Sequence, residues 1–125
     1  MLGIATGKAR RGLLATLERQ ALMGRFVTLQ TSDSNPGKPH PAMLLQAMAE
    51  TGVDPSATVL VGDTVYDIEM ARRAGTRAVG VAWGYHGPDE LEAAGADRIV
   101  FGYDELADCV LSLLKGVPCV VSNGY

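Results

Sequence analysis

The sequence predicts an α/β fold, in which a parallel β-sheet is covered by helices. Two observations support this prediction. Short apolar runs alternate with longer amphipathic stretches along the chain, which is the pattern of consecutive strand–helix–strand units. The chain also contains 15 glycines among 125 residues, which suits many tight turns between strands and helices. The length fits one domain with a single core.

Five strands are expected, each a short apolar run. The third contains an unbroken Val-Leu-Val core without polar alternation, which is typical of a central strand that is buried on both faces. In chain order, the predicted strands are residues 2–6, 26–30, 58–61, 77–82 and 98–101.

Five helices are expected between and after these strands. Pro41 suits the first turn of a helix, and glycines at positions 52, 75, 95 and 116 stand where a left-handed residue would end one. Residues 1–116 are therefore assigned to the domain and 117–125 to a C-terminal tail, which could be a short strand or a docked extension. The predicted helices are residues 9–23, 41–51, 65–74, 88–94 and 104–115.

Composition excludes several classes of partner and indicates a compartment. The net charge of −3 gives no broad cationic surface, so neither nucleic acid nor a membrane is an expected partner. No signal peptide or long apolar run is recognisable, and Cys109 and Cys119 are the only thiols. We therefore expect a cytoplasmic protein whose two cysteines are reduced and structural.

The most informative segment is the third predicted strand with the residues that follow it. Gly62-Asp63 ends the strand, and Asp67 follows four residues later. One or two carboxylates are what Mg²⁺ commonly takes from a protein, so Asp63 and Asp67 are candidate metal ligands. Taken singly, Asp63 could instead be a helix N-cap and Asp67 a solvated acid in the first helical turn.

A candidate phosphate-binding set accompanies these acids. Thr6 follows the first predicted strand, and the amides of Gly7 and Lys8 lie where a helix begins, a position that attracts anions. Lys38, in Gly-Lys-Pro-His-Pro, can hold the charge of a phosphate, although alone it could be an ordinary loop lysine. Because the carboxyl ends of parallel strands share one edge, these residues and Asp63 are expected to gather there.

For the two histidines, the sequence gives less evidence of a direct role in binding or catalysis. His40 is expected to orient the Lys-Pro-His-Pro turn, and His86 follows Trp83-Gly84-Tyr85 at the predicted site edge, where substrate contact is the less favoured alternative. Neither has a Ser or Cys partner at a spacing that indicates a nucleophilic triad.

The order of these motifs resembles the core domain of haloacid dehalogenase (HAD) superfamily phosphatases, and phosphoglycolate phosphatase-like members in particular. Thr6 matches the second family motif, Lys38 the third, and Gly62-Asp63-Thr64-Val65-Tyr66-Asp67 the fourth. The likeness continues through Arg72-Arg73-Ala74-Gly75 and Val79 to Tyr85, and covers nearly all of residues 2 to 114. It implies a Rossmann-like sheet of about five strands with helices on both faces.

The resemblance also implies an activity. Relatives hydrolyse small phosphorylated metabolites through an aspartyl-phosphate intermediate, with Mg²⁺ and a lysine holding the transferring group. The nucleophile and the proton-shuttling acid both belong to an Asp-x-Asp-Gly-Thr motif, and no Asp-x-Asp occurs in these 125 residues. We therefore expect the chain alone to be inactive and to bind Mg²⁺ weakly. The alternatives are a non-catalytic phosphate-binding or scaffold module and a regulatory partner that completes another polypeptide's sheet.

The same resemblance predicts a gap in the sheet. In the family, the strand that bears the nucleophile lies between the strands that lead to Thr6 and Asp63, and the cap domain follows it. Four structures could fill the gap: a separate N-terminal segment, the tail folding back, exchange of strands between two chains, or direct pairing of the two flanking strands. A strand-swapped homodimer is the favoured expectation.

Overall fold

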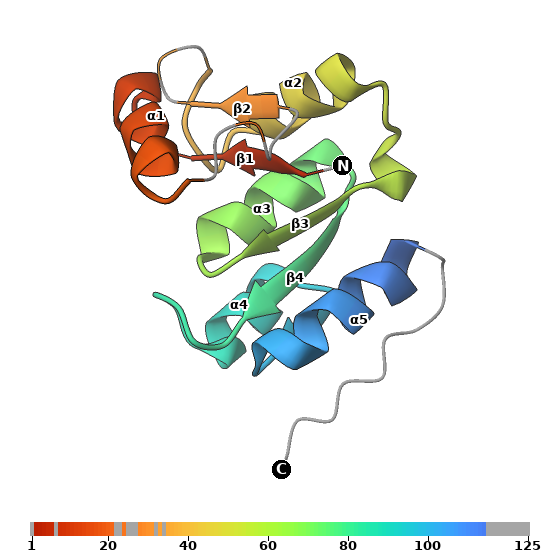
Figure 1. The fold of residues 1–125 in the computed structure, drawn as a ribbon. Helices are drawn as coiled ribbons and strands as arrows, with labels where there is room; N and C mark the ends of the chain where they lie inside the picture. Colours follow the sequence, from red (N-terminus) through yellow and green to blue (C-terminus); the bar gives the residue numbers. More distant parts are fainter. Residues whose placement is uncertain are drawn as a thin grey trace.

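The computed structural model describes residues 2–6, 8–21, 24, 28–31, 33 and 35–114. Within them, strands and helices alternate along the chain, as Figure 1 shows. The strands are β1 (Gly3–Ala5), β2 (Thr28–Gln30), β3 (Val59–Gly62), β4 (Arg77–Val81) and β5 (Arg98–Val100). The helices are α1 (Arg10–Arg19), α2 (Ala42–Thr51), the short 3₁₀ helix η1 (Pro55–Ala57), α3 (Val65–Ala74), α4 (Pro88–Ala94) and α5 (Tyr103–Leu114).

Most predicted elements are confirmed, and two helices match residue for residue. Helices α3 and α4 have the predicted bounds, because each ends at a glycine with positive φ, Gly75 and Gly95. For α1, the predicted range of residues 9–23 is too long. It ends at Arg19, and Ala21 already has a φ of 56°, which takes the chain out of the helix. The short helix η1 was not predicted.

The strands form two parallel sheets rather than one. β1 pairs with β2, and β3, β4 and β5 pair in that order. Among the described residues no ladder joins β1 to β3, so the predicted gap is present and direct pairing of the flanking strands is wrong. The proposed roles of the tail lie outside the described residues.

The third strand is not the doubly buried central strand that was predicted. β3 is an edge of its sheet, and the Val61 residue is 41% exposed. β4 takes the central place, with four of its five residues buried. The apolar run of β3 was assigned correctly to a strand, but its burial depends on a neighbour on the β1 side that the described residues do not supply.

Helices cover both faces of the larger sheet. One core joins α2, α3 and α4 to the sheet through fully buried side chains such as Met43, Ile68 and Leu91. The second core lies under α5, where Cys109 and Leu113 pack on Val79 and Val100. Cys109 is fully buried, as expected of a structural cysteine.

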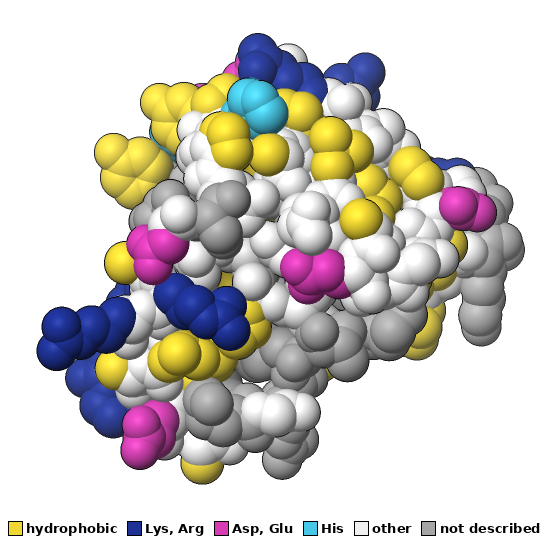
Figure 2. All heavy atoms as spheres, turned by 90° about the horizontal axis from the view of Figure 1, so that it is seen from above, with side chains coloured by type: hydrophobic (Ala, Val, Ile, Leu, Met, Phe, Trp, Pro, Cys, Tyr) yellow, Lys and Arg dark blue, Asp and Glu magenta, His cyan; other side chains and the backbone are white. Residues whose placement is uncertain are grey.

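The arrowheads of β1 to β4 point toward one side of the molecule in Figure 1, and β5 is parallel to β4, so the carboxyl ends of the strands share an edge. On the face seen in Figure 2, basic side chains form separate groups with acidic and hydrophobic side chains between them. Within the described residues, no helix is both long enough and apolar enough to cross a bilayer.

Candidate functional site

The first turn of α3 positions the acidic residue at the centre of the candidate site. Thr64 is the N-cap, and its hydroxyl accepts the Asp67 amide at 3.2 Å. In return, Oδ2 of the Asp67 carboxylate accepts hydrogen bonds from the Thr64 amide at 3.2 Å and from the Thr64 hydroxyl at 2.9 Å. This reciprocal capping box fixes the Asp67 side chain. The N-cap is therefore Thr64, and the alternative that placed Asp63 there is wrong.

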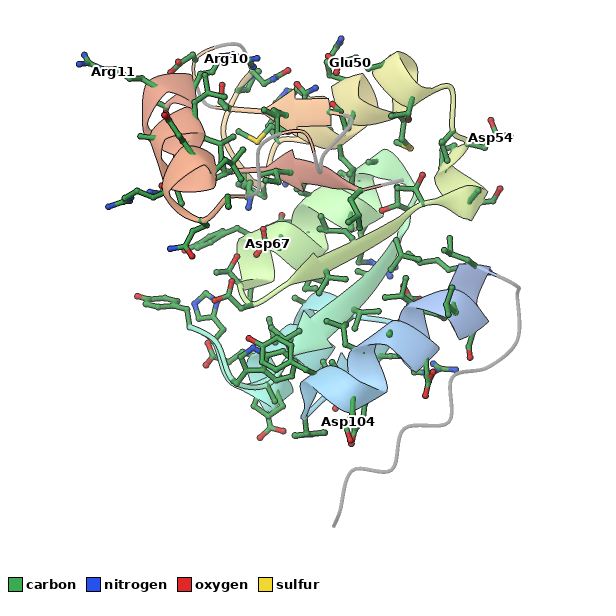
Figure 3. The ribbon with its side chains drawn as sticks, viewed as in Figure 1. Arg10, Arg11, Glu50, Asp54, Asp67 and Asp104 are labelled. Carbon is green, nitrogen blue, oxygen red and sulfur yellow. The ribbon has the colours of Figure 1, made fainter. Side chains whose placement is uncertain are left out.

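Lys38 meets Asp67 directly. The Lys38 ammonium lies 2.6 Å from Asp67 Oδ1, while Oδ2 of the same carboxylate faces Thr64. The two side chains are 23% and 7% exposed, so the pair is largely shielded from water. Asp67 is thus a buried, fully engaged acid rather than a solvated one. Figure 3 shows it at the end of the molecule to which the β3 arrowhead points.

A polar network supports the loop that carries Lys38. The buried Gln30 side chain, at the end of β2, accepts a hydrogen bond from Asn35 at 2.8 Å and donates to Glu50 of α2 at 3.0 Å. Hydrogen bonds from Thr28 and then Gln30 lower the pKa of the Glu50 carboxyl. At the other end of the loop, His40 Nδ1 accepts the amide of Ala42 at 3.1 Å and so caps α2, which fits the structural role predicted for His40.

Asp63 anchors a second loop. Its Oδ2 accepts the amide of Tyr85 at 2.9 Å, and its backbone carbonyl accepts the amide of His86 at 3.0 Å. A Cβ atom on Gly84 would lie 2.7 Å from Asp63 Cγ, so only glycine allows the loop to approach this closely. His86 Nδ1 in turn accepts the Val65 amide at 2.9 Å. His86 therefore ties the loop to the first turn of α3.

Thr6 lies just past the carboxyl end of β1, and no hydrogen bond between the described residues joins it to Lys38 or Asp67. Its hydroxyl accepts the amide of Lys8 at 3.2 Å. The Lys8 ammonium reaches the Thr16 hydroxyl at 3.3 Å, along α1. Helix α1 begins at Arg10, whose amide donates to Asp33 at 2.9 Å, so a carboxylate already occupies that helix terminus. Phosphate binding by Thr6 and Lys8 stays a prediction, and Gly7 lies outside the described residues.

Thr31 is a site residue that the motif analysis did not single out. It directly follows β2 and is fully buried, and its hydroxyl has no hydrogen-bond partner among the residues that the structure describes. A buried hydroxyl without a partner is costly, which makes this group a candidate contact for a bound ligand or water. The available signal was its position after a strand at the same edge as Thr6.

The hydrogen bonds show which carboxylate oxygens remain available to a divalent metal. Oδ1 of Asp63 has no hydrogen-bond partner among the described residues, whereas both oxygens of Asp67 are engaged. The described residues hold no cluster of three or more His, Cys, Asp or Glu side chains that could bind a metal. Asp63 therefore fits Mg²⁺ as a single carboxylate ligand.

A family model for hydrolases, described as HAD-hydrolase-like, matches residues 35–109. The chain belongs to this family. The matched range includes Lys38, Asp63 and Asp67 and leaves out Thr6. The resemblance inferred from the motifs is confirmed, and with it the α/β fold.

Individual relatives carry phosphatase names. The chain is 40% identical over 116 residues to the probable phosphatase IndB of Dickeya dadantii, covering 91% of the chain and 50% of that protein. It is 33% identical over 114 residues to a phosphoglycolate phosphatase of Synechococcus elongatus, covering 91% of the chain and 53% of the relative. A predicted phosphatase from Clostridium acetobutylicum has a similar structure, with a TM-score of 0.81, 26% identity and coverage of 89% and 52%. The chain thus spans about half the length of the relatives it matches.

Proposed function

We propose that this chain supplies the phosphoryl-binding part of a phosphomonoester hydrolase of the HAD type, acting on small phosphorylated molecules. The contact between the Lys38 ammonium and Asp67 Oδ1, at the shared carboxyl edge, supports this proposal most strongly. In a member of a family whose named relatives are phosphatases, a lysine held at this edge is a group that can bind the transferring phosphate.

Asp67 positions Lys38 but uses only part of the hydrogen-bonding capacity of its ammonium group. An ammonium group has three N–H donors, and Asp67 accepts one of them, so two can point at phosphate oxygens. Because Asp67 is locked by Thr64, the ammonium stays in place before a substrate arrives. Such preorganised charge is the main electrostatic means by which an enzyme stabilises a transferring phosphoryl group.

Asp63 is the proposed metal ligand. When bound, Mg²⁺ would neutralise phosphate charge and orient the ester. The Asp63 and Asp67 carboxylates would otherwise repel a phosphate dianion, so phosphate binding by this chain should strengthen when Mg²⁺ is added. With one free carboxylate oxygen available, we expect weak Mg²⁺ affinity.

The 125-residue chain by itself is proposed to bind phosphate without turning over its esters. The covalent nucleophile of the family lies in Asp-x-Asp-Gly-Thr, and no Asp-x-Asp is present in the sequence. The remaining electrostatic groups assist a step that this chain cannot start alone. Release of phosphate from p-nitrophenyl phosphate that disappears in Asp63→Ala would contradict this point.

The proposal is tested by titrating the ¹⁵N-labelled chain with inorganic phosphate, with and without MgCl₂. We expect amide shifts around Lys38 and Thr64, and a several-fold loss of affinity in Lys38→Met. Arg73→Met is the matched control, because Arg73 pairs with Glu69 on the exposed surface of α3 and its loss removes the same charge. Equal phosphate affinity in Lys38→Met and the unmodified chain would refute the proposed role.

A further inference from the structure

Exposed aromatic side chains gather beside the candidate phosphate site. The only tryptophan of the chain and three of its four tyrosines follow the carboxyl ends of β3, β4 and β5. Exposed fractions are 39% for Trp83, 51% for Tyr66, 75% for Tyr103 and 80% for Tyr85. Large amphipathic rings held in the open at one edge are typical of a binding surface.

These rings, together with His86, are arranged in two groups that we call the aromatic rim. Trp83 and Tyr103 have ring centroids 4.5 Å apart at an interplanar angle of 43°. His86 lies between two tyrosines, with centroids 4.8 Å from Tyr85 and 5.9 Å from Tyr66. Trp83 and each of the three tyrosines therefore have one aromatic neighbour, and their exposed fractions show that much of each of these four rings remains open to solvent.

The aromatic rim is fixed to the residues that would hold the phosphoryl group. The Tyr85 amide donates to Asp63 Oδ2 at 2.9 Å, on the carboxylate proposed to bind the metal. His86 Nδ1 accepts the amide of Val65, the residue after the Thr64 cap that locks Asp67. Tyr85 and His86 thus belong to the same hydrogen-bonded frame as Asp63 and the first turn of α3, so little loop entropy is lost when a ligand binds to both.

We infer that the aromatic rim selects phosphomonoesters whose leaving group carries a flat aromatic or heteroaromatic ring, which stacks on Trp83 or Tyr85. This inference rests on the proposed function, because it assigns the phosphate end of the same ligand to Lys38. A flat ring fits the exposed faces of these side chains, whereas a short aliphatic acid would leave them in water. Stacking of one ring on an aromatic side chain strengthens binding by about 5- to 150-fold.

Calorimetric titration of the chain with phenyl phosphate, cyclohexyl phosphate and inorganic phosphate, all with MgCl₂, tests the inference. Trp83 fluorescence gives a second readout, since it is the only tryptophan. We expect phenyl phosphate to bind at least fivefold tighter than either other probe, and to quench Trp83. Trp83→Ala and Tyr85→Ser should each reduce this preference, while inorganic phosphate binds both variants unchanged.

Leu111→Ala is the control, because Leu111 is a similarly exposed apolar side chain (53%) on α5 that is not part of the aromatic rim. Tyr85 is 80% exposed, so Tyr85→Ser keeps the test valid if Trp83→Ala unfolds. Phosphate binding without a phenyl preference would overturn the inference and leave the proposed function standing. Absence of phosphate binding would overturn both. Self-association that Trp83→Ala abolishes, without a ligand preference, would assign the aromatic rim to a second copy and also overturn the inference.

Discussion

Replacement of Asp67 by alanine should destabilise the fold far more than replacement of Glu69, although both acids belong to α3 and pair with a cation. Asp67 is 7% exposed, contacts Lys38 at 2.6 Å, and forms the capping box with Thr64. Glu69 pairs with Arg73 at 2.8 Å, but those side chains are 44% and 52% exposed. The two substitutions therefore compare a shielded ion pair with a solvated one on the same helix.

The expected loss follows from the groups that Asp67→Ala leaves without a partner. Removal of one member of a buried pair costs about 3–5 kcal/mol, and we reduce this to about 1–2 kcal/mol because Lys38 can regain part of its hydration. Loss of the capping box adds about 1 kcal/mol. The free energy of unfolding should thus fall by about 2–3 kcal/mol. For Glu69→Ala, an exposed i,i+4 pair predicts a loss of about 0.5 kcal/mol or less.

Urea unfolding followed by circular dichroism measures both losses at constant m-value. A double-mutant cycle with Lys38→Met should give a coupling energy of about 1–2 kcal/mol, against less than about 0.5 kcal/mol for the Glu69 and Arg73 pair. The shielded pair should also depend less on NaCl concentration. Equal losses for the two alanine variants, with no coupling between Lys38 and Asp67, would refute the assignment of Asp67 as the fixed partner of Lys38.

Two further predictions concern the supports of the site. In Gly62→Ala, the added Cβ would lie 2.7 Å from Asp67 Oδ2, so the free energy of unfolding should fall by about 1–3 kcal/mol and phosphate binding should weaken. Gly12→Ala is the control, because Gly12 lies in open space within α1 and its replacement should not destabilise the chain. Hydrogen bonds from Thr28 lower the pKa of the Glu50 carboxyl in the fold below its ordinary value of 4.5, so its stabilising contribution is present above pH 4.5 and is lost as the pH falls through the lowered value. Urea unfolding of Glu50→Gln should therefore show a deficit at neutral pH that disappears in acid, and a deficit that is constant with pH would contradict the argument.

Local signals explain why some elements could be predicted from the sequence and others could not. The bounds of α3 and α4 were predictable because Gly75 and Gly95 end them in a left-handed conformation. No such signal stops α1 before Gly24, and the chain leaves the helix at Ala21 instead. The burial of β3 could not be predicted either. An apolar run shows that a strand forms, but which strands lie beside it is a property of the whole sheet.

The candidate site shows the same division between local spacing and tertiary contact. Thr64 and Asp67 are three residues apart, the spacing of a capping box, so the sequence already contained the signal that places the N-cap at Thr64 rather than Asp63. Once Thr64 caps the helix, the Asp63 carboxylate is free to turn toward the loop after β4. Its contact with Tyr85 could not be predicted from spacing, because 22 residues separate the two. Gly84 was the available hint, since a glycine between two aromatic residues is consistent with a close backbone approach, and the structure shows that Asp63 lies there. Asp63 thus connects the aromatic rim to the proposed metal position, because Oδ2 accepts the Tyr85 amide and Oδ1 is the oxygen proposed to bind the metal.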